Sequence, residues 1–102
     1  MPFKKGFIAP PWSHIRGDSV RAECLIQRIE QEANRGCGLY YEIYNYRVLS
    51  ELNGVLVNLS AGDAATFKTV AASRGFSLDS GALYEAGREY QETLADIRRE
   101  QE

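Results

Sequence analysis

The stretch from residue 39 to residue 59, LYYEIYNYRVLSELNGVLVNL, constrains the fold more than any other and carries four of the six tyrosines. Its apolar side chains recur at spacings of three and four residues, which is the pattern of an amphipathic helix. The stripe consists of Tyr41, Tyr44, Val48, Leu52, Val55, Leu56 and Leu59. Other apolar residues, such as Ile43 and Tyr46, interrupt the opposite face. The sequence therefore predicts a central helix that is covered on two sides, by neighbouring helices or at an interface.

A β-hairpin over residues 39–59 is the alternative. Tyrosine, isoleucine and valine favour strands, and Asn53-Gly54 between apolar runs is a strong hairpin signal. Strict alternation of apolar and polar residues fails at residues 39–41 and again at residues 55–57, whereas the helical spacing holds for about five turns. We therefore expect the helix, with an α+β fold that contains this hairpin as the alternative.

Three shorter helices are expected to accompany the central one. The first runs from about residue 18 to residue 34, another ends at Gly75, and the last covers about residues 81–99. Phe76 follows Gly75 directly, at a position where an apolar residue commonly contacts the end of the preceding helix. The last helix has only a narrow apolar stripe, which predicts a single neighbour.

Residues 1–17 are expected to form an extended N-terminal arm. They contain all three prolines, which favour extended backbone, together with phenylalanine, isoleucine and tryptophan side chains that suit docking on another surface. The predicted fold is therefore a small all-α, four-helix domain of residues 18–102 behind an extended Pro-containing arm of residues 1–17.

Composition indicates a single globular domain. A chain of 102 residues buries roughly 60 to 65% of its unfolded surface, so oligomerisation would add to its stability. With 44% apolar and 25% charged residues, it has no run that approaches the roughly 18 to 20 apolar residues of a membrane span. The first residues lack the apolar segment of a signal peptide, and we expect a cytoplasmic protein.

The charge is distributed unevenly along the chain. Residues 1–17 carry three cations and no acid, whereas residues 78–102 carry seven acids and three arginines. A protein that binds nucleic acid over its whole surface normally presents a basic face. The distribution makes nucleic acid an unlikely general partner.

No motif of catalysis, cofactor binding or metal binding is present. Cys24 and Cys37 stand alone, and His14 is the only histidine, so the paired spacing of a zinc site is missing. Ser13 and His14 lack the glycine-framed turn of a hydrolase nucleophile. The sequence predicts a protein that is not an enzyme and has no catalytic, cofactor-binding or metal site.

The aromatic cluster of the central helix is the strongest functional signal. Tyrosine and tryptophan bury large areas at low entropic cost and dominate binding hot spots. Four tyrosines within residues 40–46 cannot share one face of a helix, so some of them meet a second surface. The predicted partner or dimer interface consists of Trp12, Tyr40, Tyr41, Tyr44, Asn45, Val48, Leu52 and Val55. A secondary partner face consists of Tyr90, Leu94 and Ile97 on the last helix.

The sequence thus predicts a small regulatory protein, expected as a homodimer, that binds and inhibits another protein. An anti-activator that occludes the interface of a transcription factor is the specific hypothesis. The alternative is a helix-turn-helix-like DNA-binding regulator that uses residues 66–90, with Lys68, Arg74, Ser80 and Arg88 as the candidate contact residues. Asp79, Glu85 and Glu89 weigh against it, because they place negative charge on the supposed recognition helix.

Overall fold

The computed structural model describes residues 18–101, which form four α-helices and no strand. The helices are α2 (Asp18–Ala33), α3 (Tyr41–Leu56), α4 (Ala61–Ser73) and α5 (Ala82–Glu100). The four-helix prediction is confirmed. The hairpin alternative for residues 39–59 is wrong, because α3 continues through Asn53 and Gly54. The predicted arm of residues 1–17 lies outside the described residues.

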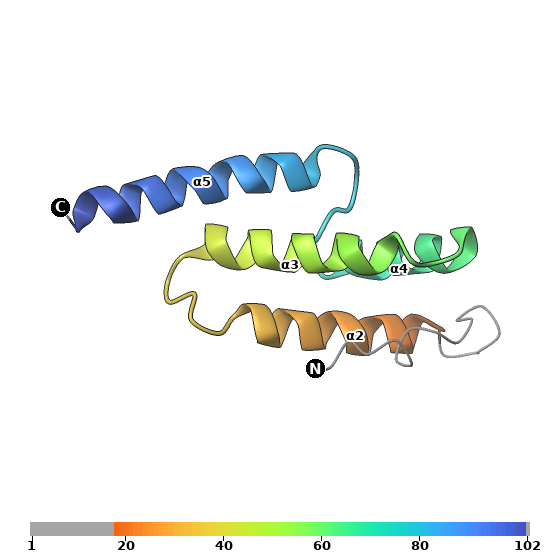
Figure 1. Ribbon diagram of the computed structural model, residues 1–102. Helices are drawn as coiled ribbons and strands as arrows, with labels where there is room; N and C mark the ends of the chain where they lie inside the picture. The colour runs from red at the N-terminus through yellow and green to blue at the C-terminus, as the bar shows by residue number, and fades with distance from the viewer. Residues whose placement is uncertain (1–17, 102) are drawn as a thin grey trace.

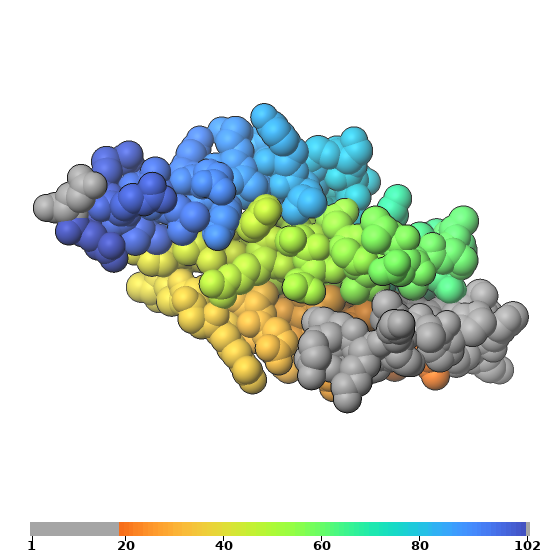
Figure 2. Space-filling model, in the orientation of Figure 1, coloured from red at the N-terminus to blue at the C-terminus, as the bar shows by residue number. Residues whose placement is uncertain are grey.

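The helices are stacked in layers around α3, which lies between α2 on one side and α5 on the other (Figure 1). The remaining helix, α4, packs mainly on α2. The molecule measures 54 × 27 × 21 Å, and its radius of gyration of 15.0 Å exceeds the ~13 Å of a compact domain of this length. It is elongated because α5 extends beyond the first turn of α3 (Figures 1 and 2).

The main core lies where α2, α3 and α4 meet. Helical spacing on α2 brings its apolar residues to one face, as the sequence predicts. The residues that are no more than 1% exposed are Ala22, Leu25, Ile26, Ile29, Val48, Leu52, Phe67 and Ala71. One apolar face of α3 is therefore buried against helices of the same chain.

The other apolar face of α3 is covered by α5. The rings of Tyr46 and Tyr90 are stacked, with centroids 4.6 Å apart and planes inclined by 18°. The expected single neighbour of the last helix is α3. The second surface that the tyrosine cluster requires is therefore supplied, at least for Tyr46, within the chain.

The ends of α4 follow local sequence signals. At its start, the hydroxyl of Ser60 accepts a hydrogen bond from the backbone N–H of Asp63, 3.3 Å away, which is a standard N-terminal cap. At its end, Gly75 has a φ of 93°, a left-handed conformation that suits glycine. The N–H of Phe76 donates to the carbonyl of Ala71, and the Phe76 ring is buried, as the sequence predicts.

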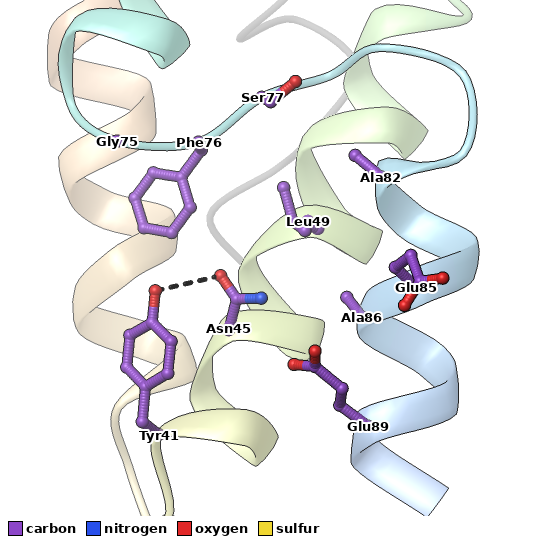
Figure 3. Close-up of a pocket in the computed structure, with 10 residues that line it drawn as sticks. All are labelled: Tyr41, Asn45, Leu49, Gly75, Phe76, Ser77, Ala82, Glu85, Ala86 and Glu89. Atoms are coloured by element: carbon purple, nitrogen blue, oxygen red, sulfur yellow. Dashed lines mark hydrogen bonds between the residues drawn. The ribbon is translucent and has the colours of Figure 1, made fainter.

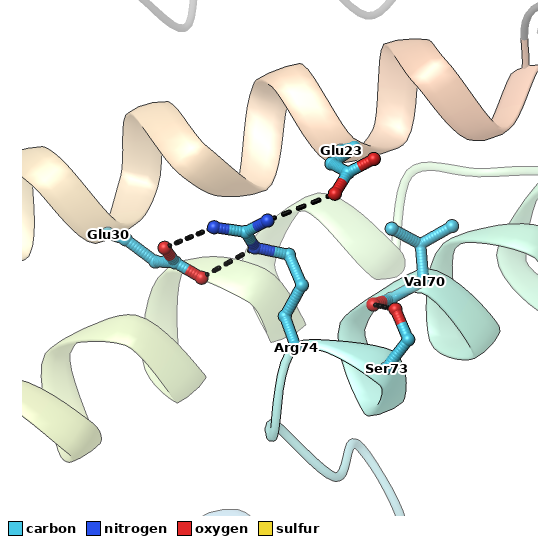
Figure 4. Close-up of polar contacts among 5 residues, drawn as sticks. All are labelled: Glu23, Glu30, Val70, Ser73 and Arg74. Carbon is cyan, nitrogen blue, oxygen red and sulfur yellow. Dashed lines mark hydrogen bonds and ion pairs between the residues drawn. The ribbon is translucent and has the colours of Figure 1, made fainter.

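Two arginines tie the helices together. Arg47 on α3 donates from Nη1 to the carbonyls of Ala33, at 3.2 Å, and Arg35, at 2.7 Å, and so caps the C-terminal end of α2. Arg74, at the end of α4, donates two hydrogen bonds to the carboxylate of Glu30, both 2.8 Å long, and one to Glu23, 3.1 Å long (Figure 4). This arrangement joins the end of α4 to α2.

Two helical glycines provide a matched test of the packing between α3 and α5. Among the described residues, a Cβ at Gly54 would meet nothing within 4 Å, whereas a Cβ at Gly87 would lie 3.3 Å from Cε1 of Tyr46. Alanine exceeds glycine in helix propensity by about 1 kcal/mol. We expect Gly54→Ala to raise the free energy of unfolding by about 0.5 to 1 kcal/mol and Gly87→Ala to give no gain. Urea denaturation measures the free energy of unfolding of both variants. Equal increases would show that the Tyr46 ring moves aside at little energetic cost.

Candidate functional site

A groove lies between α3 and α5 and is closed at one end by the segment that links α4 to α5 (Figure 3). It is lined by Tyr41, Asn45 and Leu49 from α3, by Gly75, Phe76 and Ser77 from the link, and by Ala82, Glu85, Ala86 and Glu89 from α5. Its volume is about 300 Å³. This is the lower end of the range for ligand pockets, so the groove has room for a few side chains.

The shape of the groove follows from residue spacing on its two walls. The three α3 residues are each four positions apart, so their side chains lie above one another on one face of the helix. On α5, Ala82 and Ala86 are also four apart, and their small side chains leave the space open. Leu49 and Ala86 are buried and give the groove an apolar floor.

The α3 wall presents an aromatic ring and an amide. The hydroxyl of Tyr41 donates to Oδ1 of Asn45 at 3.3 Å, while the Tyr41 side chain stays 60% exposed. The amide nitrogen of Asn45 points toward α5 (Figure 3). The wall therefore offers the Tyr41 ring together with one polar donor, the Asn45 amide.

The α5 wall is acidic. The carboxylate of Glu85 accepts a hydrogen bond from Arg88 at 2.6 Å, and Arg88 also contacts Glu92. Among residues 18–101, no lysine or arginine lies within ion-pair distance of Glu89. The wall therefore has one carboxylate in an ion pair and one with no cation within ion-pair distance among these residues.

Aromatic rings support the α3 wall from behind. The ring of Tyr44 lies 6.1 Å from that of Tyr41 and 6.3 Å from that of Phe76, the latter in an edge-to-face arrangement. Burial, and after it the negative charge of Glu30, raises the pKa of the Tyr44 phenol. Tyr44 therefore remains neutral, as a packing group that holds Tyr41 and Phe76 in place.

The structure divides the predicted interface residues between core and surface. Val48, Leu52 and Val55 lie in the hydrophobic core, so a partner cannot reach them in the folded domain. Tyr40 is 39% exposed, and Tyr44 and Asn45 are partly buried. Tyr41 and Asn45 are brought together in the groove, whereas Trp12 lies outside the described residues.

The predicted secondary face on α5 is also divided. Tyr90 is stacked on Tyr46 and so belongs to the contact between α3 and α5. Leu94 and Ile97 are partly exposed and lie in the last turns of α5. Those turns belong to the part of the helix that extends beyond the start of α3 (Figure 1).

Sequence reasoning missed the α5 side of the groove. The sequence identifies Glu85 and Glu89 as acids of the last helix that disfavour DNA and could complement a basic patch of a partner, but it assigns no role to Ala82 and Ala86. The available signal was the pair of small residues four positions apart with acids at matching spacing. That pattern does not show which helix lies opposite the small residues. The link between α4 and α5, which closes the groove, has no regular residue spacing from which its position could be predicted.

Other chemical features of the described chain are local. The thiol of Cys37 is buried and donates to the carbonyl of Ala33 at 2.8 Å, and Cys24 is exposed. Within residues 18–101, no group of three or more His, Cys, Asp or Glu side chains is placed to hold a metal ion. None of the helices in this region is both long and apolar enough to span a membrane.

Comparison with known proteins found no similarity: no model of a protein family, no curated protein and no solved structure matches the chain.

Proposed function

We propose that this protein is a small non-enzymatic regulator that binds a protein partner in the groove between α3 and α5. It inhibits that partner by covering the partner's own interface, as an anti-activator of a transcription factor would in the cytoplasm. The observation that carries the proposal is an exposed tyrosine, Tyr41, on the wall of an open groove with two carboxylates opposite. Exposed aromatic residues beside a concave apolar surface are typical of protein-binding hot spots.

Three observations favour this proposal over DNA binding by residues 66–90. Arg74 is held by Glu30 and Glu23 and is only 23% exposed in its side chain. Helices α4 and α5 are joined by residues 74–81, a longer connection than the turn of about three or four residues in helix-turn-helix proteins. Helix α5 carries five acids and three arginines, and phosphate would be repelled by that balance.

The proposed homodimer involves residues immediately before α3 rather than the apolar stripe of the helix. The core residues of the stripe are occupied within the chain, but Leu39 is 99% exposed and Tyr40 is 39% exposed, immediately before the helix. Adjacent exposed apolar side chains favour association. We propose that Leu39 and Tyr40 form the dimer contact and leave the groove open to the partner.

The test compares wild type with Tyr41→Ala and Tyr84→Ala. Both replaced tyrosines are exposed, at 60% and 75%, and Tyr84 does not line the groove. Each protein is immobilised and offered a lysate of its host cells, the retained proteins are identified, and the strongest is purified. We expect a protein that wild type and Tyr84→Ala retain and Tyr41→Ala loses, and whose own DNA binding or assembly falls when the regulator is added.

Two results would contradict the proposal. Equal retention by Tyr41→Ala would remove the groove from the interaction, and retention of DNA alone would favour the DNA-binding hypothesis. Circular dichroism of both variants checks the fold, and light scattering of the wild type measures the mass expected for a homodimer.

A further inference from the structure

We infer that the groove receives an arginine side chain presented by a helix of the partner protein. This inference rests on the proposed function and names the chemistry of the bound segment. It is drawn from the charge of the α5 wall, the aromatic ring on the α3 wall, and the length and open end of the groove.

The charge selects a cation. Glu85 and Glu89 are the ionisable carboxylates of the groove, and within residues 18–101 only Glu85 lies within ion-pair distance of an arginine. A basic side chain placed between them would complete the pairing of Glu89. A second copy of this chain is a poorer occupant through α5, because the described helix carries more acids than arginines.

The opposite wall selects a planar cation. The exposed ring of Tyr41 and the carboxylate of Glu89 both line the open end of the groove, with Asn45 between them (Figure 3). A guanidinium group can stack on such a ring and still form two parallel hydrogen bonds with a carboxylate, which a lysine ammonium cannot do. The buried Leu49 and Ala86 provide apolar surface for the methylene groups of the arginine stem.

The dimensions favour a helical segment. The α3 row, Tyr41 to Leu49, spans eight residues of rise, or about 12 Å, which is about two turns of a helix. The segment at residues 75–77 closes one end (Figure 3), so an extended peptide could not pass through. The small Ala82 and Ala86 side chains permit close approach of a helix, as in ridge-and-groove packing. A volume of about 300 Å³ then suits one or two anchoring side chains.

The experiment uses a designed alanine-based helical peptide of about 18 residues that displays a leucine and, four positions later, an arginine. Otherwise identical peptides carry lysine or glutamine in place of the arginine. Binding to the full chain is followed by NMR at up to about 1 mM peptide. We expect shifts at Asn45, Ala82 and Ala86, and an affinity for the arginine peptide about tenfold above that for the glutamine peptide.

Glu89→Gln and Glu92→Gln form a matched pair of variants. Both remove one acid from α5, but only Glu89 lines the groove. The advantage of the arginine peptide should disappear in Glu89→Gln and persist in Glu92→Gln. Equal affinity for the arginine and glutamine peptides, or an absence of shifts at the groove, would overturn the inference. Groove signals that move on dilution without any peptide would instead assign the groove to a second copy.

The outcome separates this inference from the proposed function. If binding of the captured partner depends on Tyr41 but is as strong to Glu89→Gln as to wild type, the regulatory role stands. The inference that the groove receives an arginine is then wrong. If the arginine peptide binds in the groove but no cellular protein depends on Tyr41, the chemistry of the groove stands and the regulatory role is wrong.

Discussion

Phe67→Ala is expected to lower the free energy of unfolding by about 3 to 5 kcal/mol, which is among the largest effects of a single substitution. Phe67 is fully buried and is the largest of the fully buried side chains among the described residues. It lies in the middle of α4, where that helix packs on α2. Alanine would leave a cavity that surrounding helices fill only in part, and it would remove the main apolar contact of a short helix.

Tyr84→Ala is the matched control, because it also reduces an aromatic side chain on a helix to a methyl group. Tyr84 is 75% exposed, so the loss should stay within about 0.5 kcal/mol. Urea denaturation followed by circular dichroism measures both, with the slope against urea checked for a shared unfolded state. A loss below about 1 kcal/mol for Phe67→Ala would show that α4 contributes little to the cooperative unit.

The helices could be predicted from sequence because their signals are local. Gly75 with Phe76 marks the end of α4, and a helical repeat over five turns outweighs the hairpin signal of Asn53-Gly54 in α3. The turn chemistry of Asn-Gly is available to a hairpin only where both flanking runs alternate. Here the apolar residues on both sides of Asn53-Gly54 recur with the helical period. Their packing against neighbouring helices therefore stabilises a helix that continues through Gly54.

The groove could be predicted only in part, because it depends on how separate helices are paired. The sequence indicated that the tyrosines of α3 need two surfaces, but not that α5 supplies one of them through Tyr46 and Tyr90. The stacked rings of Tyr46 and Tyr90 bury aromatic surface that, from the sequence alone, suggests a partner-binding site. Tyr41 and Asn45 remain available to a partner. Which residues line the groove depends on the register of α5 against α3, because a shift of one residue would place other side chains there.

The role of Arg74 also depends on the fold, since its carboxylate partners lie far away in the sequence. As a residue of the proposed DNA reader it would have to face solvent. It instead lies between α2 and the end of α4, and its hydrogen bonds to Glu30 raise its pKa above the ordinary value. Both side chains of this pair are largely shielded, with 23% of Arg74 and 18% of Glu30 exposed.

Arg74→Ala is expected to lower the free energy of unfolding by about 2 to 3 kcal/mol, because it leaves the Glu30 carboxylate largely buried without its cation. Glu30→Ala should cost a similar amount. Because the two residues act as one unit, the double variant should cost about as much as either single one, rather than their sum. Urea denaturation of the four proteins gives the coupling energy of this pair directly.

Arg88→Ala provides the control for this cycle, since Arg88 also contacts two glutamates, Glu85 and Glu92. Its side chain is 51% exposed, so water and salt already screen those pairs, and the expected loss is much smaller than that of Arg74→Ala. Added salt should reduce the small effect of Arg88→Ala more than the effect of Arg74→Ala. If the two arginines prove equivalent, or if the Arg74 and Glu30 effects add, the tie between α2 and α4 rests on apolar packing alone, and Arg74 becomes free to serve another role.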